Sequence, residues 1–312
     1  MNASKAIAIL NNYPHPITNL DDLKNINGIG ERILSKIKEF INTGHISQLN
    51  NIITVSNTST ADTSSDIYND LLQIYGVGAV KANSLISEHH ITSINQLRSI
   101  IISNPDVLNN KQKIGLKYYD DIKQRIPRTE MVKHESLIDK YIKTLPSLEC
   151  QITGSFRRCS ETSGDIDVLV TGNKTKFQDF LNLLINSKYI TDVLAHGQTK
   201  LMGICRIPDE TASLSSSSSS LYRRIDVIFT PKVNYPFALL YFTGSGEFNI
   251  EMRKLAMANG LLLNEKELSR DGHKITETFK TEEDIFKYLK IKYIDPCDRN
   301  ANVIAKNLLN NK

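Results

Sequence analysis

The stretch Cys150-Gln-Ile-Thr-Gly-Ser-Phe-Arg-Arg-Cys-Ser-Glu-Thr-Ser-Gly-Asp-Ile-Asp-Val-Leu-Val170 contains the pattern that decides the fold around it. It ends with alternating acidic and apolar residues, which is typical of a strand that is buried on one face. Side chains alternate between the two faces of a strand. Asp165 and Asp167 are therefore predicted to share one face. Ile166 and Val168 are predicted to point into a core on the other face.

A second run, Arg223-Arg-Ile-Asp-Val-Ile-Phe229, predicts another strand and adds a third carboxylate, Asp226. Carboxylates on one face repel each other unless one stays protonated or a cation joins them. Hard divalent cations prefer such oxygen ligands together with substrate phosphates, and a two-ion site supports displacement at phosphorus. The alternative is that Asp-x-Asp ends an edge strand and keeps it soluble.

The residues Gly154-Ser-Phe-Arg-Arg158, which we call the arginine turn, are predicted to lead from a strand into a helix. A glycine lets a phosphate approach the backbone. Helix N–H groups and arginine side chains bind phosphate oxygens. The arginine turn therefore predicts a phosphate site next to the carboxylates.

The composition is that of an ordinary globular protein of 312 residues, enough for two or three compact units. Its four cysteines form no Cys-x-x-Cys pair, so we expect reduced thiols and an intracellular, soluble protein of the nucleus, the cytoplasm or a virion. We find no signal-peptide pattern and no apolar run long enough to span a bilayer, and therefore expect no membrane partner.

The net charge of +4 is distributed unevenly. Residues 1–88 contain six basic and eight acidic side chains, a balance of −2, whereas residues 89–312 contain 32 basic and 26 acidic side chains, a balance of +6. A basic surface is typical of phosphate binding, so the positive charge outside the N-terminal segment indicates a nucleic-acid partner.

A Gly-x-Gly pattern occurs twice, at Gly28–Gly30 and at Gly76–Gly78, with matching apolar flanks 48 residues apart. Gly-x-Gly before a helix offers backbone donors to a phosphate. Two copies predict helix-hairpin-helix units that grip a DNA strand through main-chain amides without reading its sequence. A single copy would more often be a plain turn between helices. The polar residues 51–66 and the serine run 215–220 are predicted to be loops.

Four motifs together resemble the family X DNA polymerases of the polymerase beta type, over nearly the whole chain. They are Gly154-Ser-Phe-Arg-Arg158, Ser163-Gly-Asp-Ile-Asp-Val168, Arg223-Arg-Ile-Asp226 and Tyr241-Phe-Thr-Gly-Ser245. The resemblance implies an α+β fold. A helical helix-hairpin-helix domain would precede a polymerase beta-like nucleotidyltransferase palm with a mixed sheet, and a C-terminal α/β nucleotide-selecting subdomain would follow.

The resemblance also implies four parts. These are a truncated lyase-like helical domain with the first hairpin at 1–52, a helical DNA-binding subdomain with the second hairpin at 53–128, the palm at 129–235 and the C-terminal subdomain at 236–312. The implied activity is DNA-directed filling of short gaps in base-excision or related repair. The implied partners are gapped or nicked double-stranded DNA and a dNTP, and we expect a monomer.

The catalytic residues implied by the resemblance are Asp165, Asp167 and Asp226, which would hold two Mg²⁺ ions, with Mn²⁺ able to substitute. Lys36 would be the nucleophile of a deoxyribose-phosphate lyase. The implied nucleotide-binding residues are Arg125, Gly154, Ser155, Arg158, Gly164, Tyr241, Phe242, Gly244 and Asn249. Two departures from the resemblance speak against the lyase assignment: by comparison with the family we expect its first helix to be missing, and residues 1–88 carry an acidic balance.

The DNA-binding residues implied by the resemblance are Gly28, Gly30, Arg32, Gly76, Gly78, Lys200, Arg224 and Arg253. Na⁺ or K⁺ would bind backbone carbonyls at each hairpin, from Lys24, Ile26 and Ile29 and from Leu72, Ile74 and Val77. Two other functions stay open, a nucleotidyltransferase that needs no template and a non-catalytic protein that binds DNA ends.

Overall fold

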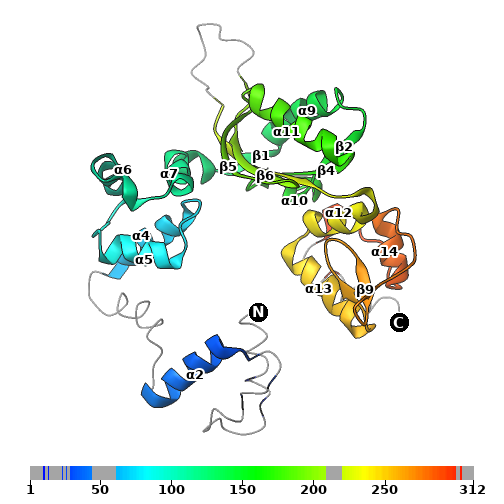
Figure 1. The fold of residues 1–312 in the computed structure, drawn as a ribbon, viewed down its shortest axis with the longest axis horizontal. Coiled ribbons are helices and arrows are strands. Elements are labelled where there is room, and N and C mark those ends of the chain that lie inside the picture. The colour runs from blue at the N-terminus through cyan, green and yellow to red at the C-terminus, as the bar shows by residue number, and fades with distance from the viewer. Residues whose placement is uncertain are drawn as a thin grey trace. The chain divides into compact units, whose positions relative to one another are not determined.

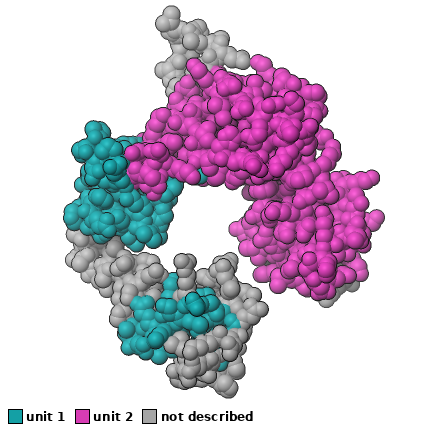
Figure 2. All heavy atoms as spheres, in the orientation of Figure 1, with its two compact units in different colours: residues 1–107 teal, residues 108–312 magenta. Residues whose placement is uncertain are grey.

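The computed structural model describes residues 10, 13, 23, 26, 29–43, 61–208, 220–299 and 303, except for the side chains of residues 32 and 61–65. The chain divides into two compact units, Met1–Val107 and Leu108–Lys312 (Figure 2). Each unit is described by itself. The serine run 215–220 lies outside the described residues except for Ser220.

The first unit is helical. Its described helices are α2 (Glu31–Thr43), α4 (Ala61–Gln73), α5 (Ala79–Ser87), α6 (Ile94–Ser103) and the short η3 (Pro105–Val107). The predicted loop over residues 51–66 is wrong from residue 61 onward, where α4 has begun. Serine, threonine and aspartate are favoured at the start of a helix as well as in loops, so this composition does not separate the two.

The two Gly-x-Gly segments have the same backbone hydrogen bonds, displaced by 48 residues. In the first, the Ile29 amide donates to the Ile26 carbonyl (3.0 Å). In the second, the Val77 amide donates to the Ile74 carbonyl (3.0 Å). Buried apolar side chains, among them Leu23 and Leu71, support both turns. The repeat read from the sequence is therefore a repeat of local structure.

The second unit is built on a five-stranded mixed sheet (Figure 1). Its order is β2 (Leu148–Ile152), β4 (Ile166–Gly172), β7 (Arg223–Phe229), β6 (Lys200–Cys205) and β5 (Ile190–His196). β4 and β7 are parallel, and the other neighbours are antiparallel. The helices α9 (Arg128–Ile142) and α11 (Lys174–Asn186) pack on the face that carries Val168 and Val227.

Short elements connect this sheet to its surroundings. They are α7 (Asn110–Lys117), α8 (Tyr119–Ile122), β1 (Ile126–Pro127), α10 (Gly154–Arg157) and β3 (Thr162–Ser163). β1 pairs antiparallel with β3. This pairing brings the residues before α9 next to those before β4.

The C-terminal subdomain has a hydrophobic core of its own. It contains η4 (Lys232–Asn234), α12 (Tyr235–Thr243), α13 (Gly246–Ala258), β8 (Leu262–Leu263), β9 (Leu268–Arg270), β10 (His273–Lys274), α14 (Glu282–Tyr288) and η5 (Pro296–Asp298). Phe248, Phe286 and Leu289 belong to this core, which is distinct from the core beneath the mixed sheet. The predicted α+β class and order of helical and mixed-sheet parts are confirmed.

The expectation of four reduced cysteines is wrong for one pair. Cys159 and Cys297 form a disulfide, with their Cα atoms 5.1 Å apart, while Cys150 and Cys205 are free. The two bonded residues are 138 positions apart, so no local spacing pattern could pair them. Among the described residues, no helix is both long and apolar enough to cross a membrane.

An ion pair inside the second unit anchors the first residue of β7. Arg223 is 2% exposed, and its guanidinium donates to both carboxylate oxygens of Glu130 at 2.7 Å. Burial disfavours the charged form of Glu130. The His134 ring, whose Nε2 lies 3.6 Å from a carboxylate oxygen, and the hydrogen bonds and charge of Arg223 outweigh that effect and lower the pKa of Glu130 from 4.5 to about 2.

This pair is expected to make stability depend on pH. Because the folded pKa of Glu130 lies below its ordinary value, the carboxylate stabilises the fold above about pH 4.5 and loses that contribution as the pH falls towards 2. We expect this group to lose on the order of 2 kcal/mol between pH 7 and pH 3, because only about 1.5 pH units of its titration range lie within that interval. Urea unfolding between pH 7 and pH 3 measures it, and Glu130→Gln should flatten the profile. If the stability of Glu130→Gln depends on pH as steeply as that of the parent, Glu130 is not the source of the pH dependence.

Candidate active site

Parallel pairing brings the predicted carboxylates to one face of the sheet. Asp167 of β4 lies directly opposite Asp226 of β7 in the register. Asp165, the residue before β4, is near enough for its charge to act on Asp167. Burial, together with the charges of Asp165 and Asp226, raises the pKa of Asp167 to about 7. We call these three residues the carboxylate cluster.

Basic side chains pair with two members of this cluster. Lys200 Nζ lies 2.9 Å from a carboxylate oxygen of Asp226, and Arg224 pairs with Asp165. In the part of the chain that the structure describes, no three His, Cys, Asp or Glu side chains are arranged to hold a metal ion. Lys200 and Arg224, which the sequence predicted to bind DNA, thus neutralise predicted metal ligands in this structure.

The arginine turn begins against the carboxylate cluster. Gly154 has φ +59°, and a Cβ atom there would lie 2.8 Å from Oδ2 of Asp167. The Thr153 amide donates to the Asp167 carbonyl (2.8 Å), which ties the turn to β4. Only glycine combines this backbone conformation with such a close approach. The sequence predicted that Gly154 lets a phosphate approach the backbone, and in this structure the group that approaches it is the Asp167 carboxylate.

Three further predicted nucleotide ligands gather around β3. Ser155 Oγ donates to Ser163 Oγ (3.0 Å). Arg125 donates from Nε to Thr162 Oγ1 and from Nη2 to the Thr162 carbonyl, both at 2.8 Å. A Cβ on Gly164 would lie 3.6 Å from Arg125 Nη1. Arg125, Ser155 and Gly164 are thus neighbours of the same short strand.

The second arginine of the turn reaches the end of α12. Arg158 Nη1 donates to the Thr243 carbonyl (2.6 Å). Gly244 has φ +71°, and a Cβ there would lie 3.2 Å from that same nitrogen. Burial lowers the pKa of Arg158, and the charges of Glu247 and Asp167 act against that effect. Gly244 therefore makes room for the guanidinium.

The aromatic and polar residues predicted to select the nucleotide form one cluster at the α12–α13 corner. The rings of Tyr241 and Phe242 meet edge to face at 5.1 Å. Asn249 Nδ2 donates to the Tyr241 carbonyl (2.8 Å), and the Arg253 guanidinium lies over the Tyr241 ring at 5.2 Å. In this structure the polar groups of Asn249 and Arg253 therefore contact Tyr241.

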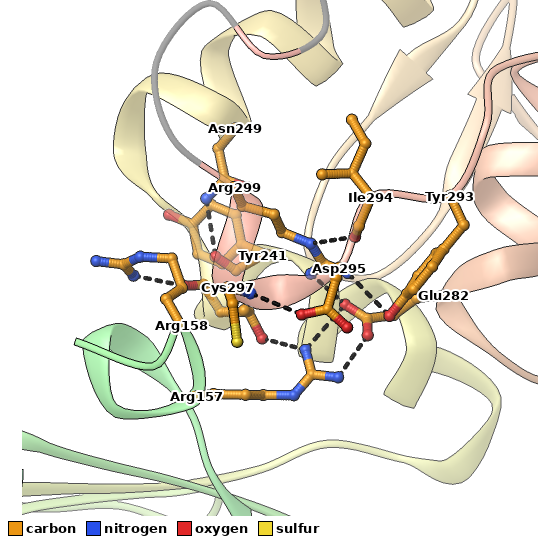
Figure 3. A network of polar contacts seen from close by, with 11 residues as sticks. Arg157, Arg158, Tyr241, Asn249, Glu282, Tyr293, Ile294, Asp295, Cys297 and Arg299 are labelled. Carbon is orange, nitrogen blue, oxygen red and sulfur yellow. Dashed lines mark hydrogen bonds and ion pairs between the residues drawn. The ribbon is translucent and has the colours of Figure 1, made fainter. Parts of the chain in front are cut away.

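Sequence reasoning missed a buried ionic network that joins the arginine turn to the C-terminal subdomain (Figure 3). Arg157 donates to both carboxylate oxygens of Glu282, at 3.1 and 2.6 Å, and to Thr243 Oγ1 at 2.6 Å. Arg299 donates to the same carboxylate at 2.6 Å. Glu282 is 4% exposed and Arg299 0%. No sequence pattern links residues so far apart, although Arg157 was visible as part of the turn.

Residues predicted to act in the first unit are described by that unit alone. Lys36 lies on α2 and is exposed. Gly30 and Gly78 precede α2 and α5, and a Cβ at either would meet nothing within 4 Å. Gly76 has φ +82°. Ile26, Ile29, Leu72, Ile74 and Val77 are described, whereas Lys24, Gly28 and the Arg32 side chain lie outside the described residues.

Four family models match consecutive parts of the chain. A helix-hairpin-helix domain matches residues 4–46, the fingers domain of DNA polymerase lambda residues 69–123, the DNA polymerase beta palm residues 125–232 and the DNA polymerase beta thumb residues 238–300. The matched parts follow one another in the order that the sequence motifs implied.

Relatives of known name agree with these models. DNA polymerase lambda of Rattus norvegicus is 31% identical over 317 residues, which cover 95% of this chain and 51% of the relative. DNA polymerase lambda of Arabidopsis thaliana is 31% identical over 322 residues, covering 95% of this chain and 57% of the relative. The chain belongs to the family X DNA polymerases. It spans about half the length of these relatives.

The buried network yields a prediction for stability. Glu282→Gln removes the charge that Arg157 and Arg299 share and leaves buried guanidinium groups without compensation. We expect a loss on the order of 3 kcal/mol in the free energy of unfolding, measured by urea titration. Glu283→Gln, at an exposed neighbour in the same helix, is the matched control and should leave stability unchanged. If both variants unfold like the parent, the network does not hold the subdomain.

Proposed function

We propose that the protein is a DNA-directed DNA polymerase that fills short gaps in base-excision or related repair. The observation that carries the proposal is the register of β4 and β7, which sets Asp167 opposite Asp226 beside the arginine turn. Membership of family X supports it. We also propose the four-part division at residues 1–52, 53–128, 129–235 and 236–312.

The donor chemistry of the carboxylate cluster suits hard divalent cations, which would take the place of Lys200 and Arg224 at its oxygens. Its donors are carboxylate oxygens, and burial and mutual repulsion raise the pKa of Asp167, a cost that a cation would relieve. Asp165 and Asp167 would hold both Mg²⁺ ions and Asp226 would complete one site, with Mn²⁺ able to substitute. When bound, such ions neutralise charge on the attacking and leaving oxygens of an in-line displacement at phosphorus.

The arginine turn and its neighbours would bind the triphosphate of a dNTP. Arg125, Ser155 and Gly164 meet at β3, and Arg158 and Gly154 flank the carboxylate cluster. Held there, the α-phosphate would face the primer 3′-hydroxyl, and Asp226 would accept its proton as pyrophosphate leaves. Fixed position and fixed charge supply most of the rate in such a site.

The α12–α13 corner would select the nucleotide. Tyr241, Phe242 and Gly244 would contact the sugar, Asn249 the minor-groove edge of the incoming base and Arg253 the template strand. Minor-groove acceptors are common to all four bases. Contacts there would test the shape of a base pair without preferring one base.

The two hairpins would hold gapped or nicked DNA through the amides after Gly28, Gly30, Gly76 and Gly78. Na⁺ or K⁺ would bind the backbone carbonyls of each hairpin turn and offset the charge of the DNA phosphates. Lys200 and Arg224 would turn from Asp226 and Asp165 to the DNA backbone, with the protein acting as a monomer.

Primer extension on a one-nucleotide gap tests the proposal. Asp226→Ala should lower the extension rate by at least roughly 10³-fold, because charge stabilisation is lost, while binding of gapped DNA is largely retained. Asp179→Asn, an exposed aspartate on α11, is the matched control. Extension by Asp226→Ala near the parent rate would disprove the role.

The same assay separates the two other functions. Omitting the template strand should abolish extension. Extension without a template would identify a template-independent nucleotidyltransferase. DNA binding without extension in any condition would identify a protein that binds DNA ends.

We propose in addition a deoxyribose-phosphate lyase centred on Lys36. Its exposed amine on α2 can form a Schiff base with an aldehyde, and Arg32, one turn earlier, would hold the phosphate. Borohydride should trap a covalent adduct on incised abasic DNA in the parent and not in Lys36→Ala. Lys38→Ala, at another exposed position of α2, is the control. Equal trapping by Lys36→Ala would exclude this nucleophile.

A further inference from the structure

The disulfide Cys159–Cys297 joins the arginine turn to the C-terminal subdomain. Cys159 directly follows Arg158, and Cys297 lies in η5, two residues before Arg299. The Cα separation of 5.1 Å is within the range that a disulfide spans. The covalent bond thus connects two segments that the Arg157–Glu282–Arg299 network also connects (Figure 3).

This bond constrains parts that otherwise have separate hydrophobic cores. The core beneath the mixed sheet contains Phe156 of the turn, and the other core contains Phe248 and Phe286. A dNTP in the proposed site would contact residues on both sides, Ser155 and Arg158 on one and the α12–α13 corner on the other. Any change in the distance between the two sides would therefore change nucleotide binding.

In the disulfide-bonded structure, donors on both sides are engaged within the protein. Arg158 Nη1 donates to the Thr243 carbonyl at 2.6 Å. Asn249 Nδ2 donates to the Tyr241 carbonyl at 2.8 Å. These internal hydrogen bonds must give way before the same groups bind a nucleotide. The covalent link spans the first of these contacts, because Cys159 follows Arg158 and Cys297 belongs to the C-terminal subdomain, and it favours the arrangement in which that contact is formed.

The bonded cysteines are accessible, and the two others are not reactive. Cys159 and Cys297 are both exposed. Burial raises the pKa of Cys150 and of Cys205 to about 12, which keeps their thiols protonated. Thiol–disulfide exchange needs access to a sulfur and a thiolate to attack it. Exchange with an external thiol is therefore confined to the Cys159–Cys297 bond.

We propose that the Cys159–Cys297 disulfide is a redox switch for nucleotide binding, holding the C-terminal subdomain in a resting arrangement when oxidised and releasing it when reduced. The inference rests on the proposed polymerase function. The reductant is a dithiol. One of its thiolates attacks a sulfur of the disulfide, the S–S bond breaks and a mixed disulfide forms. The second thiolate of the reductant then attacks the mixed disulfide and displaces the cysteine bound in it. The dithiol becomes a disulfide, and both cysteines become thiols.

The test compares the full chain after treatment with glutathione disulfide and after treatment with dithiothreitol. Thiol titration in denaturant should find the two free cysteines in the oxidised protein and all four in the reduced protein. The KM for dNTP in gap filling should fall about five-fold or more on reduction. Cys159→Ser and Cys297→Ser should have the low KM in both conditions. Cys150→Ser, the control, should keep the response.

Several outcomes would overturn the switch. They are four titratable thiols after oxidation, a KM that is equal in both states, and a KM that rises on reduction. Limited proteolysis of the C-terminal subdomain gives a readout that needs no activity: cleavage should be faster after reduction in the parent and already fast in Cys159→Ser. Redox-dependent cleavage without any extension would refute the polymerase proposal and leave the conformational switch standing. If the protein extends the primer but neither its cleavage nor its KM depends on the redox state, the switch is refuted and the polymerase proposal stands.

Discussion

The parallel pairing of β4 with β7 is the constraint on which the site depends. Side chains alternate along both strands, so a slip of one residue would carry Asp226 from the open face to the buried face and set Val227 among carboxylates. Two contacts fix the ends of these strands to neighbouring elements. The buried Arg223–Glu130 pair fixes the start of β7, and the Thr153 amide fixes the arginine turn to β4. Apolar packing under the sheet thereby sets the position of charges above it.

A second constraint is the ionic network between two hydrophobic cores. Removing three charged side chains from water costs free energy, and this network buries Arg157, Glu282 and Arg299. An apolar contact of equal size would stabilise the subdomain as much or more. An ion pair, however, is directional. It orients the Arg157 side chain on Glu282 and Thr243, and through the backbone it places Arg158 at the Thr243 carbonyl. The network therefore determines which way the arginine turn faces, beyond what it adds to stability.

Local patterns were enough to predict that Asp165 and Asp167 flank an apolar residue on one strand, that Gly154 begins a turn and that the hairpin repeats, because each follows from backbone geometry within a few residues. The approach of Asp226 to Asp167 depends instead on the pairing of β4 with β7, which no local pattern determines. Local periodicity failed where two residues that interact are far apart in the sequence. Cys159 and Cys297 are 138 residues apart, and Glu282 is 125 residues from Arg157. It also failed at the start of α4, where polar residues suit a helix terminus and a loop equally. The pairing of Lys200 with Asp226 depends on the register of β6 against β7, which side-chain alternation does not determine.

The charges of the site form a balanced set in this structure, and that balance links ligands to one another. Lys200 and Arg224 neutralise Asp226 and Asp165, and Asp167 instead has a raised pKa. On the proposed function, divalent cations would compete for the carboxylate of each internal pair, and DNA phosphates would compete for its basic side chain. A cation that binds the carboxylates makes the two basic side chains available to phosphate, and phosphate that binds them exposes the carboxylates to a cation. Each ligand therefore strengthens the other, and the coupling is reciprocal by thermodynamic necessity.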